Sequence, residues 1–191
     1  MKRPPILLIL LLTIFVGSCE KWTDPDSKPV PGIEDRKYCN DPEAVNYNWG
    51  FPGTPDSSVC YYPVDVFAGT YSFRDSVYND DNSLDSIKSL NTIQIQIVPL
   101  TKSRFALVGF CPNDSLRFTA LRNALNASSD STIRESDTSF NYGQFLCRTE
   151  DTLVGTITRN QTDTTFSQIY INFTVVSDTA INFHRGTAYK N

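Results

Sequence analysis

This sequence of 191 residues contains little histidine and little glutamate, and it has no excess of basic charge. His184 is the one histidine, so an all-histidine metal site is excluded. The formal net charge of −4 argues against nucleic-acid binding, which requires a basic patch. The sequence has no βαβ pattern and no glycine-rich phosphate loop, which excludes Rossmann and TIM-barrel architectures on their usual signals.

Because histidine and glutamate are scarce, few side chains in this sequence could form an active site. A Ser-His-Asp triad would have to use His184, and no serine lies in a Gly-x-Ser-x-Gly elbow. His184 falls in the predicted last strand, where a histidine is typically a surface or rim residue. Of the five glutamates only Glu43 has an apolar setting, so paired carboxylates for glycoside hydrolysis are weakly supported. We therefore expect no enzymatic activity, no cofactor and no bound metal.

Residues 1–18 predict a lipoprotein signal peptide. Lys2 and Arg3 precede an eleven-residue run, 6–16, that is apolar except for one threonine. At about 1.5 Å per residue this run is too short to cross a hydrocarbon core of about 30 Å. The sequence Val-Gly-Ser-Cys at 16–19 resembles the bacterial lipobox, which implies that Cys19 is acylated, for example with palmitate, and becomes the first residue. Ordinary secretion with cleavage after small residues is the alternative.

Residues 19–37 are expected to form an acylated tether to the membrane. Three prolines and a glycine between residues 25 and 32 favour an extended, semi-rigid segment. Asp24 and Asp26 are similar to the acidic export signal that follows the acylated cysteine in surface-exposed lipoproteins of the Bacteroidota. The resemblance implies a lipid anchor in the outer membrane and exposure at the cell surface, with a periplasm-facing position as the alternative.

The remaining four cysteines predict two disulfides. An even number of cysteines in an exported chain is typical of disulfide bonding, and four cysteines allow three pairings. We favour Cys39–Cys60 because these two bracket one compact loop, which leaves Cys111–Cys147. A zinc site would need Cys-x-x-Cys pairs, and the sequence contains none.

Residues 38–63 predict a small disulfide-stapled loop module. Residues 38–48 (YCNDPEAVNYN) and 56–62 (DSSVCYY) resemble the short Cys-rich module of Bacteroidota surface proteins, whose opening has the form C-x-D-P-x-A-x-N-Y-N. The middle, 49–55, departs from that pattern. Trp49 and Phe51 within it are candidates for surface contact with a glycan or protein partner, and the alternative is that they pack onto the neighbouring domain.

The same loop offers oxygen ligands that a calcium site could use. The candidates are Asp41, Asn46, Asn48 and Asp56. Calcium takes six to eight oxygens, several of them from carboxylates, and only two of these four side chains are charged. We therefore favour a structural role for the loop over a metal site.

Residues 64–191 predict an all-β domain. Strands are expected where apolar residues alternate or cluster: 67–78, 93–97, 104–111, 115–121, 142–148, 152–158, 166–176 and 180–189. The gaps 79–88 and 123–139 are expected to be loops, with one helical turn conceivable at 86–91 or 121–127. About eight strands in simple sequential order favour an antiparallel up-and-down barrel, with a β-sandwich as the alternative.

The two ends of this domain carry a second resemblance. Residues 67–71 (FAGTY) and 184–189 (HRGTAY) are similar to small lipocalin-like lipoproteins of the same bacterial group. The resemblance implies an up-and-down barrel that follows the Cys-rich module. Two departures are Tyr71, where lipocalins have the tryptophan of Gly-x-Trp, and the long insertion 123–139. That group is largely uncharacterised, so the resemblance implies a fold and a location and no activity.

Aspartate precedes serine or threonine unusually often. Ten of the sixteen aspartates do so, and this pattern is typical of turns that start strands. Seven of these pairs continue with a small or apolar residue or threonine, and the triplets resemble the O-glycosylation motif of Bacteroidota secreted proteins, in which Asp-Ser/Thr is followed by an aliphatic residue or threonine. The resemblance implies O-glycosylation at hydroxyls among Ser76, Ser86, Ser115, Ser131, Thr152, Thr164 and Thr179.

Taken together, these features predict a non-enzymatic, membrane-anchored lipoprotein that acts as a binding or structural module at the cell envelope. Its expected partners are the membrane, through the lipid, and an envelope protein, a glycan or a small apolar ligand. The alternative is a lipocalin-like carrier of a small apolar ligand, which needs a cavity of about 300 Å³ or more. Ten aromatic residues supply bulk to fill a small barrel: Phe67, Tyr71, Phe73, Phe105, Phe110, Phe118, Phe140, Phe145, Phe173 and Phe183.

Overall fold

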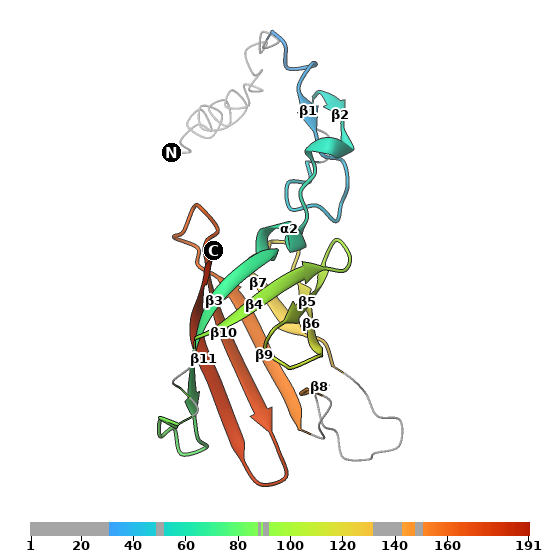
Figure 1. Cartoon of the computed structure of the whole chain (residues 1–191). Coiled ribbons are helices and arrows are strands. Elements are labelled where there is room, and N and C mark those ends of the chain that lie inside the picture. Colours follow the sequence, from blue (N-terminus) through green and yellow to red (C-terminus); the bar gives the residue numbers. More distant parts are fainter. Residues whose placement is uncertain (1–30, 49–51, 88, 90–91, 132–142, 148–150) are drawn as a thin grey trace, which may run out of the picture.

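The computed structural model describes residues 31–48, 52–87, 89, 92–131, 143–147 and 151–191. A small N-terminal module sits at one end of a β-barrel (Figure 1). The predicted signal peptide 1–18, Cys19, most of the predicted tether, Trp49 and Phe51 lie outside the described residues. Within those residues, no helix has the length and apolar character that a membrane crossing requires.

The barrel is closed and has eight antiparallel strands in sequential order, as the alternating pattern predicted. β11 pairs with both β10 and β3, and this pairing closes the ring. The simple order confirms the up-and-down barrel, and the sandwich alternative is wrong. The strands are β3 (Gly69–Tyr78), β4 (Thr92–Pro99), β5 (Arg104–Val108), β6 (Ser115–Ala120), β7 (Asn126–Ser129), β9 (Thr152–Arg159), β10 (Gln168–Val176) and β11 (Ile181–Lys190).

The alternation of side chains along each strand determines which of them point into the barrel. In β10 every second residue is buried, because successive side chains of a strand point to opposite faces of the wall. β3 follows the same rule from Tyr71 to Val77, with Asp75 on the buried side between Phe73 and Val77. The inward faces of the strands form one apolar core with the short helix α2 (Pro63–Phe67), whose Phe67 is fully buried.

Four predictions about the bounds of the elements were wrong. β7 lies inside 123–139, where a loop was expected, and β7 also replaces the helical turn conceivable at 121–127. The first strand begins at Gly69 and not at residue 67, because residues 63–67 form α2. The strand expected over 104–111 ends at Val108, and only β8 (Gln144–Phe145) forms within 142–148.

β7 and β8 share one position in the barrel wall, between β6 and β9. β7 pairs with β9 at residues 156–158, and β8 pairs with β9 at residues 152–153. Where β7 ends, the buried side chain of Gln144 takes over the pairing with β6. Its Oε1 accepts a hydrogen bond from the backbone N–H of Arg117, and its Nε2 donates to the carbonyl of Arg117, both at 2.8 Å.

The module is built around one disulfide. Cys39 and Cys60 are bonded, which confirms the favoured pairing. Short parallel strands β1 (Lys37–Tyr38) and β2 (Thr54–Pro55) precede a single turn of 3-10 helix, η1 (Ser57–Val59). α2 follows directly, so the module leads into the barrel without a spacer.

Candidate functional site

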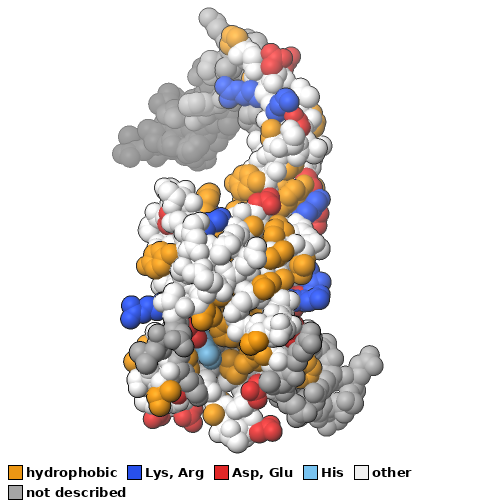
Figure 2. All heavy atoms as spheres, in the orientation of Figure 1, with side chains coloured by type: hydrophobic (Ala, Val, Ile, Leu, Met, Phe, Trp, Pro, Cys, Tyr) orange, Lys and Arg blue, Asp and Glu red, His pale blue; other side chains and the backbone are white. Residues whose placement is uncertain are grey.

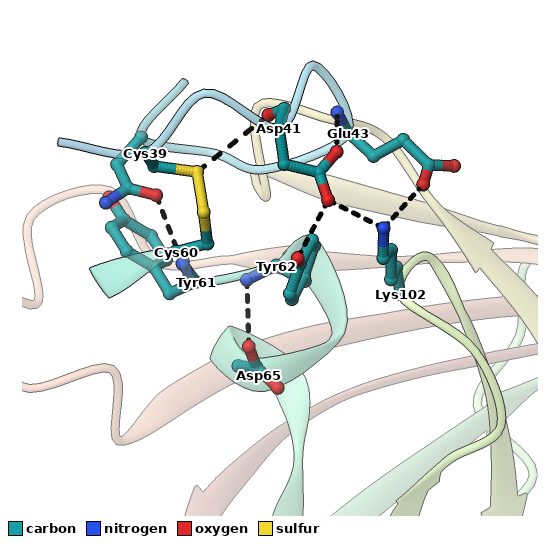
Figure 3. Close-up of polar contacts among 9 residues, drawn as sticks. Cys39, Asp41, Glu43, Cys60, Tyr61, Tyr62, Asp65 and Lys102 are labelled. Atoms are coloured by element: carbon teal, nitrogen blue, oxygen red, sulfur yellow. Dashed lines mark hydrogen bonds and ion pairs between the residues drawn. A yellow bond between two sulfur atoms is a disulfide. The ribbon is translucent and has the colours of Figure 1, made fainter. Parts of the chain in front are cut away.

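Four side chains form one contact between the module and the barrel (Figure 3). Lys102, in the β4–β5 loop, places Nζ 2.6 Å from Oδ2 of Asp41 and 3.0 Å from Oε2 of Glu43. The hydroxyl of Tyr62 donates to the same Oδ2 at 2.8 Å. The hydrogen bond from Lys102, followed by those from the Glu43 N–H and the Tyr62 hydroxyl, lowers the pKa of Asp41 to about 2. We call Asp41, Glu43, Tyr62 and Lys102 the junction cluster.

A second barrel loop contacts the module beside this cluster. Arg122, in the β6–β7 loop, donates from Nε to the carbonyl of Ala44 at 3.3 Å. Its guanidinium lies over the ring of Tyr47, 5.1 Å from the ring centre. The module is therefore held at two points on the same end of the barrel.

Three of the four candidate calcium ligands serve as hydrogen-bond partners: Asp41 in the junction cluster, and Asp56 and Asn46 within the module. The carboxylate of Asp56 contacts Nζ of Lys37 at 2.8 Å and accepts from the N–H of Ser58. These contacts, with that of Lys37 first, hold the pKa of Asp56 well below its usual range. Asn46 accepts from the N–H of Tyr61 and donates to the carbonyl of Val59. The described residues contain no group of three or more His, Cys, Asp or Glu side chains that could hold a metal ion.

A row of aromatic rings runs through the barrel interior. Successive ring centres are 5.4 to 5.6 Å apart. The row begins at the module end and reaches the opposite end of the barrel, and its members in order are Phe67, Phe105, Phe118, Phe173, Phe110 and His184. We call this row the aromatic column. Tyr71 is also fully buried, and its hydroxyl donates to the carbonyl of Phe67.

The aromatic bulk predicted from the sequence is mostly in this interior. Phe183 is an exception, because it lies on the other parity of β11, half-buried, with the guanidinium of Arg185 over its ring. Phe145 is half-buried on β8, and Phe140 lies outside the described residues. The prediction that Phe183 helps to fill the barrel was therefore wrong.

The end of the barrel opposite the module carries an acid–imidazole pair. Nδ1 of His184 lies 2.6 Å from Oδ2 of Asp75, and both side chains are largely buried. Oδ1 of Asp75 has no hydrogen-bond partner among the described residues. The connections that follow β3, β5, β7 and β10 lie at this end, which we call the far mouth; their described loop residues are 79–87, 89, 109–114, 130–131, 143, 146–147, 151 and 177–180. In Figure 2 the histidine is visible between hydrophobic side chains.

An open cavity lies along the β5–β6 loop. It has a volume of about 700 Å³, is open to solvent and is lined by residues 108–115, which include Phe110. The ring of Phe110 makes edge contacts with Phe173 and with His184, so one side chain borders both the cavity and the pair. The Cys111–Cys147 disulfide, which confirms the second predicted pairing, anchors the loop next to Phe110.

The alternating sequence pattern predicts the strand that holds His184, but it does not predict that Asp75 is its partner. The two residues are 109 positions apart, so no local spacing connects them. The available signal was parity: Asp75 alternates in step with Tyr71, Phe73 and Val77, which are core residues. A carboxylate at such a position requires an explanation.

The seven candidate glycosylation hydroxyls divide by exposure. Ser86, Ser131, Thr164 and Thr179 are exposed in turns or loops. Ser76, Ser115 and Thr152 are half-buried within strands. Several of the preceding aspartates accept hydrogen bonds from the backbone one or two residues later, as turn chemistry predicts; they include Asp85, Asp114 and Asp163.

Comparison with known proteins gives only remote similarities. No protein-family model and no curated protein sequence matches the chain. A solved structure described as "a redesigned beta barrel" is 10% identical with a TM-score of 0.38, covering 69% of this chain and 96% of its own. A structure of "EF1p2_mFAP2b bound to DFHBI" is 12% identical with a TM-score of 0.41, covering 68% of this chain and 97% of its own. Similarities this distant carry no argument about function.

Proposed function

We propose that this chain is a non-enzymatic, lipid-anchored envelope protein whose filled barrel serves as a rigid binding or structural module. The aromatic column is the observation that carries this proposal. Stacked and edge-on rings occupy the barrel from α2 to the far mouth, in the space that a carrier of a large apolar ligand would leave open. A closed barrel of this kind is compatible with a binding role, which we assign to its surface and its far mouth.

The module–barrel contact supports a rigid arrangement. The junction cluster and Arg122 join the module to two barrel loops, while the Cys39–Cys60 disulfide fixes the module itself. Cys19 is the proposed acylation site, and residues 19–37 the tether. An acidic chain is repelled by anionic lipid, so we propose that the barrel stands off the membrane at the cell surface.

The native mass of the mature protein, extracted gently from its own membrane, tests this proposal. We expect the acyl increment at Cys19, two disulfides and no dissociable apolar molecule. Any glycan increments should map to the exposed hydroxyls Ser86, Ser131, Thr164 and Thr179. The Cys19→Ala variant is the control, since it should lose the acyl mass and the membrane association together.

Two results would overturn parts of the proposal. A fatty-acid-like mass bound at one per chain, and released on collisional activation, would show that the protein is a carrier and that the barrel opens. A Cys19→Ala variant that stays in the membrane fraction would show that the anchor lies elsewhere.

A further inference from the structure

We propose that the far mouth binds a small organic cation, namely a primary ammonium on an aromatic or apolar body, through the carboxylate of Asp75. This inference goes beyond the scaffold role, because it assigns a ligand class to one end of the barrel. Three observations on different residues support it.

The first observation is an unused acceptor. Asp75 is 8% exposed, and only Asp75 and Gln144 are buried polar residues among those that the structure describes. The amide of Gln144 is satisfied at both ends by Arg117. Oδ2 of Asp75 meets His184, but Oδ1 has no partner among the described residues. A buried carboxylate oxygen without a donor is unfavourable, and an ammonium supplies up to three N–H donors.

The second observation is the surrounding aromatic wall. The ring centre of Phe110 is 5.6 Å from that of His184 and 5.4 Å from that of Phe173. Phe110 also lines the solvent-open cavity of about 700 Å³, so this one ring borders both that cavity and the histidine that is paired with Asp75. Aromatic rings attract cations through their faces and provide contact area for an apolar body.

The third observation is the distribution of charge between the two ends of the barrel. Within the described parts of the far-mouth loops there are seven aspartates and no lysine or arginine: Asp80, Asp81, Asp85, Asp114, Asp130, Asp151 and Asp178. Lys102 and Arg122 lie at the module end. Figure 2 shows acidic side chains gathered around the far mouth on the face in view. The described part of this rim is acidic, and negative charge raises the local concentration of cations, so it favours a cation over a neutral or anionic analogue.

The test compares three probes of one shape on the mature protein: 2-phenylethylamine, 2-phenylethanol and phenylacetate. His184 is the one histidine, so its ring protons give a single, assigned NMR reporter beside Asp75. We expect the amine to shift the His184 signals saturably, the alcohol to bind at least tenfold more weakly, and phenylacetate to cause no shift. Equal binding of amine and alcohol, or no saturable shift up to millimolar amine, would overturn the proposal.

Two variants locate the site. Asp75→Asn should weaken amine binding at least tenfold. Asp178→Asn makes the same charge change at the same end, in the β10–β11 turn, and should leave the affinity within about twofold. Equal losses in both variants would show that only the general field attracts the amine, which contradicts the assignment to Asp75.

Phe110→Leu keeps the proposal testable if Asp75→Asn does not fold. This variant retains the carboxylate and removes the aromatic contact, so amine binding should fall severalfold, and unchanged binding would overturn the site. The outcome is independent of the scaffold proposal. A bound apolar molecule would overturn the filled barrel, whereas these titrations report only on the far mouth.

Discussion

Gln144 shows how one side chain can complete a β-sheet. β7 ends before it pairs with the whole length of β6. Without Gln144, the backbone N–H of Arg117 on β6 would have no acceptor on a neighbouring strand. The Gln144 amide presents an acceptor and a donor in the same relation as a backbone peptide group, at 2.8 Å for both bonds. Its burial follows from this role, because a buried amide is tolerated when both ends are paired.

Gln144→Met should lower the free energy of unfolding by about 1–3 kcal/mol, since the variant keeps the volume but leaves the Arg117 N–H without its acceptor. Chemical denaturation provides the measurement. Gln96→Met, at an exposed position of β4, is the matched control and should change stability by about 0.5 kcal/mol or less. Equal effects of the two substitutions would show that the hydrogen bonds of the Gln144 amide to β6 do not stabilise the barrel.

At the scale of elements, the sequence predicts those strands whose inward face is built from large apolar residues. β10 alternates Ile169, Ile171, Phe173 and Val175 on the buried side, so its period of two is plain. β7 escapes prediction because its residues are Asn, Ala, Ser and Ser, and Ala127 is its one fully buried side chain. Its extended form comes from pairing with β6 and β9, which no local pattern records.

α2 escapes prediction for a different reason. Five residues are too few to show a helical period, and Val64, Val66 and Phe67 also fit a strand. The available signal was at the N-terminus, where Pro63 opens the helix and the carboxylate of Asp65 accepts from the N–H of Tyr62 at 2.8 Å. The pairing of Asp75 with His184 could not be predicted for a third reason, because β3 and β11 become neighbours only when the barrel closes.

The two disulfides should stabilise separate parts of the chain. Removing the bond across 36 residues with Cys111→Ala and Cys147→Ala should lower the barrel's unfolding free energy by about 2–4 kcal/mol, through greater entropy of the unfolded chain. Removing the other bond with Cys39→Ala and Cys60→Ala should disorder the module and leave the barrel transition nearly unchanged. Near-UV circular dichroism follows the barrel, and amide NMR signals follow the module. Loss of the barrel transition in the second variant would contradict the prediction that the two disulfides stabilise separate parts of the chain.

At the scale of the whole molecule, the module and the barrel are expected to tumble as one body at neutral pH. Lys102→Gln should release this coupling, because Lys102 is the group that joins Asp41 and Glu43 to the barrel. Backbone ¹⁵N relaxation should then report faster tumbling for residues 31–48 than for the strands. Lys190→Gln, which removes the same charge from β11, should leave the two rates equal. Equal tumbling rates in the Lys102 variant would show that Arg122 and α2 are enough to hold the module rigidly on the barrel.

The same contact gives a pH dependence of known sign. The pKa of Asp41 is lowered from 3.8 to about 2, so the folded contact favours the ionised carboxylate. Its stabilising effect is therefore complete above about pH 4 and fades as the pH falls through about 2. In Lys102→Gln the pKa of Asp41 should rise toward its ordinary value, as carboxyl ¹³C shifts can show. An unchanged low pKa in that variant would contradict the role of Lys102.

The pairing of β11 with β3 also determines when the barrel can form. β3 begins at Gly69, and its closing partner starts only at Ile181, so more than a hundred residues must leave the ribosome or a translocation pore before the ring can close. Until then the edges of β3 and β10 stay unpaired, and an exposed edge is a template for aggregation. Both disulfides join cysteines that emerge before β11. Oxidation can therefore restrict the incomplete chain as it emerges from the translocation pore, while closure is necessarily a late step in its folding.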